Sequence, residues 1–192
     1  TAGDGHGHCH GGIPHRRGCP GAGACLGHRP GHRGAAGLAG HGGGPSARGV
    51  GVDVDTTSYE PGHIAAAVGW NWQTQLSDQL RRDIASEQQW QDLLAATGIG
   101  NDTKVVLYGD NNNWFATYAF WQMKIYGHRR VKMMNGGRQK WIDEGRPTNT
   151  DAADVQRRVY RASNADTSIR ATREYVIDTA STRNNIGLVD VR

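Results

Sequence analysis

Two groups of residues in this sequence have side chains that could support chemistry. The first lies near the start, where His6, His8, Cys9, His10 and His15 fall close together. Imidazole and thiolate ligands at such short range suit zinc or a similar metal, although their spacing matches no closed tetrahedral site. A metal-handling head is therefore one alternative, and we expect no metal or other cofactor in the folded part.

The second group is a polar loop between a predicted strand and a predicted helix. The loop residues are Gly109, Asp110, Asn111, Asn112 and Asn113. The junction between a strand tip and a helix start is a natural place for an anion or a substrate.

Two aromatic residues, Trp114 and Phe115, follow the loop directly. They occupy the first turn of the predicted helix, which often faces a cleft. We expect both to line a substrate cleft.

The chain has three cysteines, Cys9, Cys19 and Cys25, and all of them lie in the head. An odd number in a stretch of this composition indicates no disulfide framework. A reducing compartment fits this pattern, and we expect a cytoplasmic protein.

The first 49 residues are predicted to be a disordered head. Residues 1–50 hold 17 of the 28 glycines and 7 of the 9 histidines, but no Phe, Trp or Tyr. Such a segment cannot bury enough apolar surface to offset the entropy of ordering it. Its bias towards residues with GC-rich codons and the lack of a starting Met favour a frameshifted or fragmentary start, with a flexible tail as the alternative.

The net charge of +4 comes entirely from the head, so residues 51–192 are electrically balanced. A nucleic-acid-binding domain normally concentrates Lys and Arg in its folded part. No run of apolar residues is long enough to cross a membrane. We expect neither a nucleic-acid nor a membrane partner, and the oligomeric state stays open.

From Val50 onwards, the chain alternates between strand and helix patterns. Strands are expected at 49–55, 104–108 and 131–134, and an extended segment at 62–72. Helices are expected after Ser86, which forms a capping box with Gln89, and over 114–126 and 138–144. Trp114, Tyr118, Trp121 and Ile125 have helical spacing. This order predicts an α/β domain over 50–147 with a mainly parallel sheet and helices on both faces.

After Pro147 the chain is polar, and 148–165 is predicted to be a linker. The pattern then restarts, with a helix expected over 172–180 and a strand over 186–192. Because the strand echoes residues 51–55, we expect 166–192 to begin a second, truncated copy of the domain. Asp190 and Arg192 would lie at the end of that strand, where a second site could begin.

The folded part has two histidines, His63 and His128, each following a glycine at the boundary of an element. We expect them to form structural hydrogen bonds rather than to act in catalysis. Motifs of serine hydrolases, zinc proteases, nucleotide-binding loops and dithiol redox proteins are absent from the sequence.

Several stretches resemble the tandem-domain rhodaneses, which are thiosulfate or 3-mercaptopyruvate sulfurtransferases. The similar stretches cover most of 50–192: GHIAAAV at 62–68, residues 104–145, DTSIRATREYVIDTA at 166–180, and LVDVR at 188–192. The resemblance implies two rhodanese domains, of which the second carries the catalytic cysteine and the first is a silent copy.

The resemblance also implies how the full-length form would act. A cysteine would take sulfane sulfur from a small-molecule donor, hold it as a persulfide and pass it to cyanide or a thiol. The loop at 109–113 matches the active-site loop but contains no thiol, and the strand end at Tyr108 and Gly109 matches the position of the catalytic cysteine. We therefore expect this chain to be inactive alone, with Trp114, Phe115, Asp190 and Arg192 near the cleft between domains. The alternative is a non-catalytic module that binds a partner or an anion at the loop.

Overall fold

The computed structural model describes residues 47–182 and 186–189. Residues 1–46 of the predicted head lie outside the described residues, as do Asp190 and Arg192. Residues 47–49, which were predicted to belong to the head, are part of the first strand, Ala47–Asp53.

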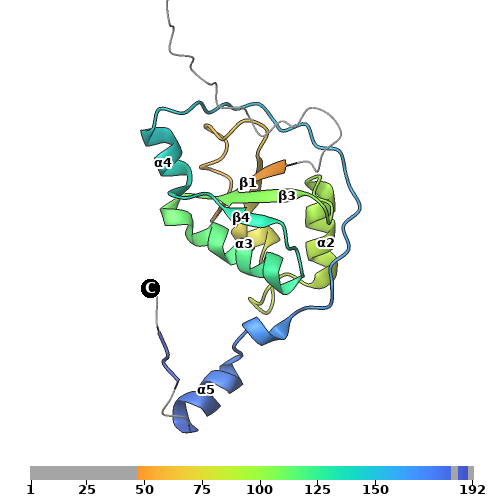
Figure 1. The fold of residues 1–192 in the computed structure, drawn as a ribbon, viewed down its shortest axis with the longest axis vertical. Helices are drawn as coiled ribbons and strands as arrows, with labels where there is room; N and C mark the ends of the chain where they lie inside the picture. The colour runs from red at the N-terminus through yellow and green to blue at the C-terminus, as the bar shows by residue number, and fades with distance from the viewer. Residues whose placement is uncertain (1–46, 183–185, 190–192) are drawn as a thin grey trace, which may run out of the picture. The chain divides into compact units, whose positions relative to one another are not determined.

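A four-stranded parallel sheet forms the centre of the domain (Figure 1). Its strands are β1 (Ala47–Asp53), β2 (Val68–Asn71), β3 (Lys104–Tyr108) and β4 (Val131–Met133), in the spatial order β2-β1-β3-β4. Gly51 of β1 lies opposite Gly69 of β2 and Tyr108 of β3. Because all strands run in the same direction, the loops that follow β1 and β3 come together at one edge of the sheet.

The helices of the described chain are α1 (Trp72–Gln75), α2 (Glu87–Ala96), α3 (Trp114–Ile125), α4 (Gly137–Asp143) and α5 (Arg173–Thr182), with short 3-10 helices η1 (Asn111–Asn113) and η2 (Thr167–Ile169). The predicted capping box of α2 is confirmed: Ser86 Oγ accepts from the N–H of Gln89, and Gln89 Oε1 accepts from the N–H of Ser86. Helix α2 is followed by Gly98 with φ +73°, which suits a glycine at a helix end. Trp72, expected in an extended segment, begins α1 instead.

Both faces of the sheet are covered, as the sequence predicts. Alternate strand residues point to opposite faces, and the larger core cluster contains Val50 and Val52 of β1 together with Leu107 of β3, packed with Trp90 of α2 and Met123 of α3. A smaller cluster on the other face contains Tyr108, Ile64 and Ala67, with Met134 and Trp141 packed against it.

The buried face of α3 differs from the aromatic stripe suggested by helical spacing. Its apolar buried residues are Ala116, Ala119, Met123 and Ile125, whereas Tyr118 and Trp121 are half-buried and Trp114 is exposed. Small side chains let the helix approach the sheet closely, and the bulky rings lie along its flank. Two of the six tryptophans, Trp70 and Trp90, are fully buried.

The segment predicted as a linker packs along the domain. Its contacts with the domain include two hydrogen bonds between the backbones of His63 and Asn149, both 2.9 Å, and one from the N–H of Arg158 to the carbonyl of Ala95 at 3.1 Å. Tyr160 is 5% exposed and joins the larger core cluster. We call residues 148–163 the strap.

The predicted helix beyond the strap is present as α5. Residues 186–189 form no strand, although the sequence pattern predicts one over 186–192. A parallel strand requires a neighbour for its backbone hydrogen bonds, and no strand of the described chain pairs with these four residues.

Candidate functional site

The polar loop follows β3 directly and leads into α3. Asn111, Asn112 and Asn113 all adopt positive φ values, 47°, 56° and 66°. Asparagine tolerates this left-handed region better than most residues because its short polar side chain bonds locally. Three consecutive asparagines therefore suit the sharp reversal of the chain between strand and helix.

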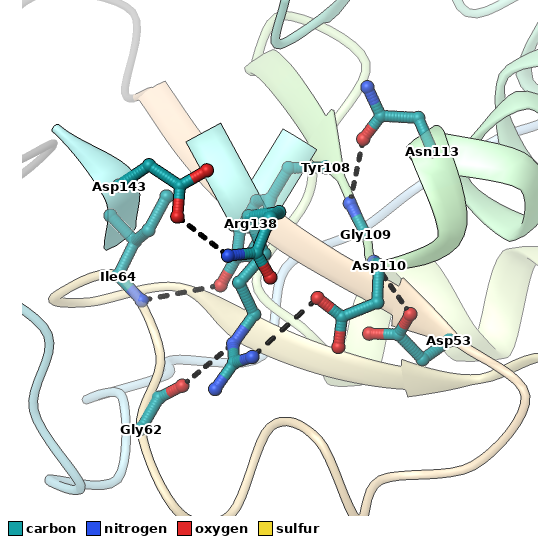
Figure 2. A network of polar contacts seen from close by, with 10 residues as sticks. Asp53, Gly62, Ile64, Tyr108, Gly109, Asp110, Asn113, Arg138 and Asp143 are labelled. Atoms are coloured by element: carbon teal, nitrogen blue, oxygen red, sulfur yellow. Dashed lines mark hydrogen bonds and ion pairs between the residues drawn. The ribbon is translucent and has the colours of Figure 1, made fainter. Parts of the chain in front are cut away.

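The side chain of Asn113 fills the interior of the loop. Its Oδ1 accepts a hydrogen bond from the N–H of Gly109 at 2.9 Å, as Figure 2 shows, and its Nδ2 donates to the carbonyl of Met134 at 2.8 Å. Asn113 is 8% exposed. The loop thus satisfies an inward-facing backbone amide with its own carboxamide.

Residues of α4 hold the loop from the other side. The N–H of Arg138 donates to the carbonyl of Gly109 at 3.0 Å. Gly137 lies so close that a Cβ there would be 2.5 Å from the Gly109 carbonyl oxygen and 2.7 Å from Asn113 Oδ1. A glycine at 137 is therefore required for this approach, as well as for its φ of +62°.

Two carboxylates and one guanidinium lie beside the loop (Figure 2). Asp53, at the end of β1, accepts a hydrogen bond from the N–H of Asp110 at 2.8 Å. Asp110 forms a 3.5 Å ion pair with Arg138, and Arg138 Nε also donates to the carbonyl of Gly62 at 3.1 Å. Asp53 therefore connects β1 to the loop after β3, and Arg138 connects that loop to α4 and to residue 62.

Asp53 is the one strongly perturbed carboxyl group in the described part of the chain. Burial raises its pKa to about 6, and the nearby negative charge of Asp110 adds to the shift. The hydrogen bond from the Asp110 N–H and the charge of Arg138 oppose it. Asp53 can therefore hold or release a proton near neutral pH.

Gly109 cannot accept a side chain in this backbone arrangement. A Cβ at this position would collide with the carbonyl oxygen of Val52. The family resemblance matches the strand end at Tyr108 and Gly109 with the position of the catalytic cysteine. A cysteine at 109 would therefore not fit this backbone arrangement.

The two aromatic residues after the loop lie differently from each other. Trp114 is 61% exposed and stacks on Phe115, with ring centroids 5.9 Å apart. Phe115 is half-buried and packs against Trp72, with the two ring centroids 5.2 Å apart. The structure thus places Trp114 on the surface next to the loop; its role in a cleft stays a prediction.

The sequence reasoning missed Asp53, Arg138 and Gly137 as parts of this site. Asp53 had one signal, since it ends a buried strand and matches Asp190 in the echoed strand. The sequence contains no such signal for Arg138 or Gly137, because their contacts with Gly109 depend on how α4 packs against the loop.

Both histidines form hydrogen bonds with backbone carbonyls. The ring nitrogens of His63 lie 3.1 Å from the Tyr59 carbonyl and 3.0 Å from the Asp151 carbonyl, and the ring stacks on Tyr59. His128 Nε2 lies 3.0 Å from the Thr103 carbonyl, and burial lowers the pKa of this histidine. These contacts tie loops together, and none of them involves a residue of the polar loop at 109–113.

Within residues 47–182 and 186–189, no three His, Cys, Asp or Glu side chains are grouped so that they could bind a metal ion. In the same part of the chain, no helix has the length and hydropathy needed to span a membrane.

The fold and the site together define the class of protein to which this chain belongs. It is an α/β domain with a parallel sheet and a polar loop at the carboxyl end of a central strand, where proteins of this architecture carry their functional groups. The family model described as the rhodanese-like domain matches residues 46–144. The chain belongs to the rhodanese family.

Curated relatives agree with this assignment. A protein of Mycolicibacterium smegmatis is 48% identical over 143 residues, which is 74% of this chain and 50% of the relative. A protein of Haloferax volcanii is 45% identical over 148 residues, covering 77% of this chain and 51% of the relative. Both are provisionally named thiosulfate sulfurtransferases. The chain spans about half the length of the curated relatives it matches.

Solved structures support the fold. The crystal structure of SseA from Escherichia coli, a 3-mercaptopyruvate sulfurtransferase, has a TM-score of 0.61 at 16% identity, covering 70% of this chain and 55% of that protein. Tum1 from Saccharomyces cerevisiae has a TM-score of 0.60 at 14% identity, covering 70% of this chain and 50% of that protein. At this level of identity, the comparison concerns the fold alone.

Proposed function

We propose that this domain is the non-catalytic rhodanese domain of a tandem sulfurtransferase. In the whole protein, a cysteine of a second domain would carry sulfane sulfur from thiosulfate or 3-mercaptopyruvate to cyanide or a thiol. The support is the family, the names of relatives of which this chain spans about half, and the echo of residues 51–55 at 188–192. On this proposal, residues 148–165 join the domains and 166–192 begin the second one.

One observation supports the silent role most strongly. The loop at 109–113 has no thiol, and Asn113 already binds the inward-facing amide of Gly109. A persulfide-forming cysteine needs free backbone N–H groups around it to favour its thiolate. A loop filled by its own carboxamide offers no such environment at that amide.

The alternative function is anion binding at the same loop. The N–H groups of Asn111 and Asn112 make no hydrogen bond to any described residue, and successive left-handed residues can form an anion-binding concavity. The carboxylates of Asp53 and Asp110 lie beside the loop, however, and would repel an anion. We therefore favour the silent structural role.

Two measurements on the purified chain test the proposal. A thiosulfate:cyanide assay should give no more thiocyanate than a variant with Cys9, Cys19 and Cys25 replaced by serine. Thiocyanate above that control would contradict the silent role. In a thiosulfate titration followed by ¹⁵N NMR, the amide signals of Asn111 and Asn112 should stay in place; saturable movement would favour the anion-binding alternative.

A further inference from the structure

We infer that Asn135 is a site of spontaneous covalent modification, at which its side-chain amide is lost through cyclisation onto Gly136. The inference concerns the turn between β4 and α4. It is independent of the sulfur chemistry proposed above.

The sequence supplies the reacting pair. Asn135 precedes Gly136, and no other asparagine in the chain is followed by glycine. In the reaction, the backbone nitrogen of the following residue attacks the asparagine side-chain carbon. A side chain on that residue hinders the attack, and glycine has none. The asparagines of the polar loop, in contrast, are followed by Asn or Trp.

The structure exposes both groups. Asn135 and Gly136 are exposed, and neither the Asn135 carboxamide nor the Gly136 N–H makes a hydrogen bond to a described residue. The turn is closed by one long hydrogen bond, from the N–H of Gly137 to the carbonyl of Met134 at 3.4 Å. Gly136 has φ +82°, as position three of a type II turn requires. The two reacting groups are therefore free of the contacts that would hold them in place.

The chemistry balances without an oxidant or a reductant. A bond forms between the Gly136 nitrogen and Asn135 Cγ, the bond from Cγ to Nδ2 breaks, and Nδ2 leaves as ammonia with the proton from the Gly136 N–H. Water then opens the cyclic imide at either carbonyl. The products are an aspartate at 135 and an isoaspartate, whose backbone is one carbon longer.

The surroundings favour the charged product. Asn135 lines a surface cavity of about 300 Å³ together with Lys140, Glu144 and Arg146. Lys140, Glu144 and Arg146 together carry a net charge of +1. A new carboxylate at 135 would reduce the net charge of the residues that line this cavity to zero. The aspartate product would therefore gain two nearby cations.

The isoaspartate product would act on the polar loop. Gly137 follows this turn directly and lies against the Gly109 carbonyl, which also accepts the N–H of Arg138. An additional backbone carbon at 135 would displace Gly137. We therefore expect isoaspartate formation to weaken the hydrogen bond between Arg138 and Gly109.

Peptide mapping of the full chain tests the inference. The protein is incubated in mildly alkaline buffer, because base removes the proton of the attacking nitrogen, and is then digested with trypsin. Cleavage after Lys132 and Arg138 releases residues 133–138, which contain Asn135 as their one asparagine. Cleavage after Lys104 and Lys124 releases 105–124, which contain Asn111, Asn112 and Asn113 and serve as an internal control.

We expect the 133–138 peptide to convert with time into two acidic products, one of them an isoaspartate substrate for an isoaspartyl methyltransferase. The 105–124 peptide should keep its amides. The intact protein should gain one negative charge on ion exchange, and Asn135→Gln should not. Retention of the Asn135 amide in the folded chain would overturn the inference, whether or not the urea-unfolded chain converts.

Discussion

The side-chain oxygen of Asn113 accepts the backbone N–H of Gly109 at 2.9 Å, so the polar loop is closed by one of its own residues. The same side chain donates to the carbonyl of Met134. One asparagine therefore links the end of β3, the start of α3 and the end of β4.

Asn113→Ala should destabilise the domain by about 1–3 kcal/mol, because the buried Gly109 N–H loses its acceptor. Asn112→Ala is the matched control, since Asn112 has a similar positive φ but is exposed. Urea unfolding measures both. Equal losses in the two variants would mean that the left-handed backbone, not the hydrogen bond, causes the effect.

The raised pKa of Asp53 predicts a pH-dependent stability. Its carboxyl has a pKa of about 6 in the folded chain and about 4 when unfolded. Between these values the folded state binds more protons, so the stability contribution is complete below pH about 4 and is lost as pH rises through about 6. The loss is on the order of 2–3 kcal/mol.

Asp53→Asn should remove most of this pH dependence. The asparagine oxygen can still accept the Asp110 N–H, and no charge is buried. The variant should be more stable than the native chain above pH about 6, and the difference should shrink towards pH about 4. Thermal unfolding across that range measures it, and parallel curves for the two proteins would refute the assignment.

Substitution of Gly109 by cysteine should not create an active loop. The new Cβ would collide with the Val52 carbonyl, so we expect Gly109→Cys and Gly109→Ala to lose similar stability, about 1–3 kcal/mol, and neither to form thiocyanate. Gly187→Ala serves as a control, because a Cβ there meets no atom within 4 Å. Sulfurtransferase turnover by a stable Gly109→Cys variant would disprove the prediction.

Tyr160 should anchor the strap. Its ring is buried in the core, 5.7 Å from the ring of His128, while its neighbour Val159 is 77% exposed. Tyr160→Ala should cost about 3 kcal/mol by leaving a cavity, and Val159→Ala should cost less than about 0.5 kcal/mol. Guanidinium unfolding gives both values. If the strap were only a loose linker, the two variants would have similar stability.

Local patterns in the sequence were sufficient for the main elements. The apolar run at 104–108 and the capping box of Ser86 and Gln89 predicted β3 and the start of α2, since both signals lie within a few residues. The β-branched run at 49–55 predicted the first strand, which spans Ala47–Asp53. The GDNNN loop and the family resemblance were also readable directly from the residues.

Only the tertiary structure shows that Asp53 contacts Asp110, which lies 57 residues further along the chain. The same holds for the ion pair between Arg138 and Asp110. Parallel strands must be joined by long crossovers, so residues that meet at the sheet edge are distant in sequence, and no local pattern marks them. The strap is a second example: polar composition predicted a linker at 148–165, and only the structure shows that the Tyr160 ring and backbone hydrogen bonds attach this segment to the domain. Sequence determined which elements form; packing between distant elements determined which polar groups meet and that Asn113 closes the loop.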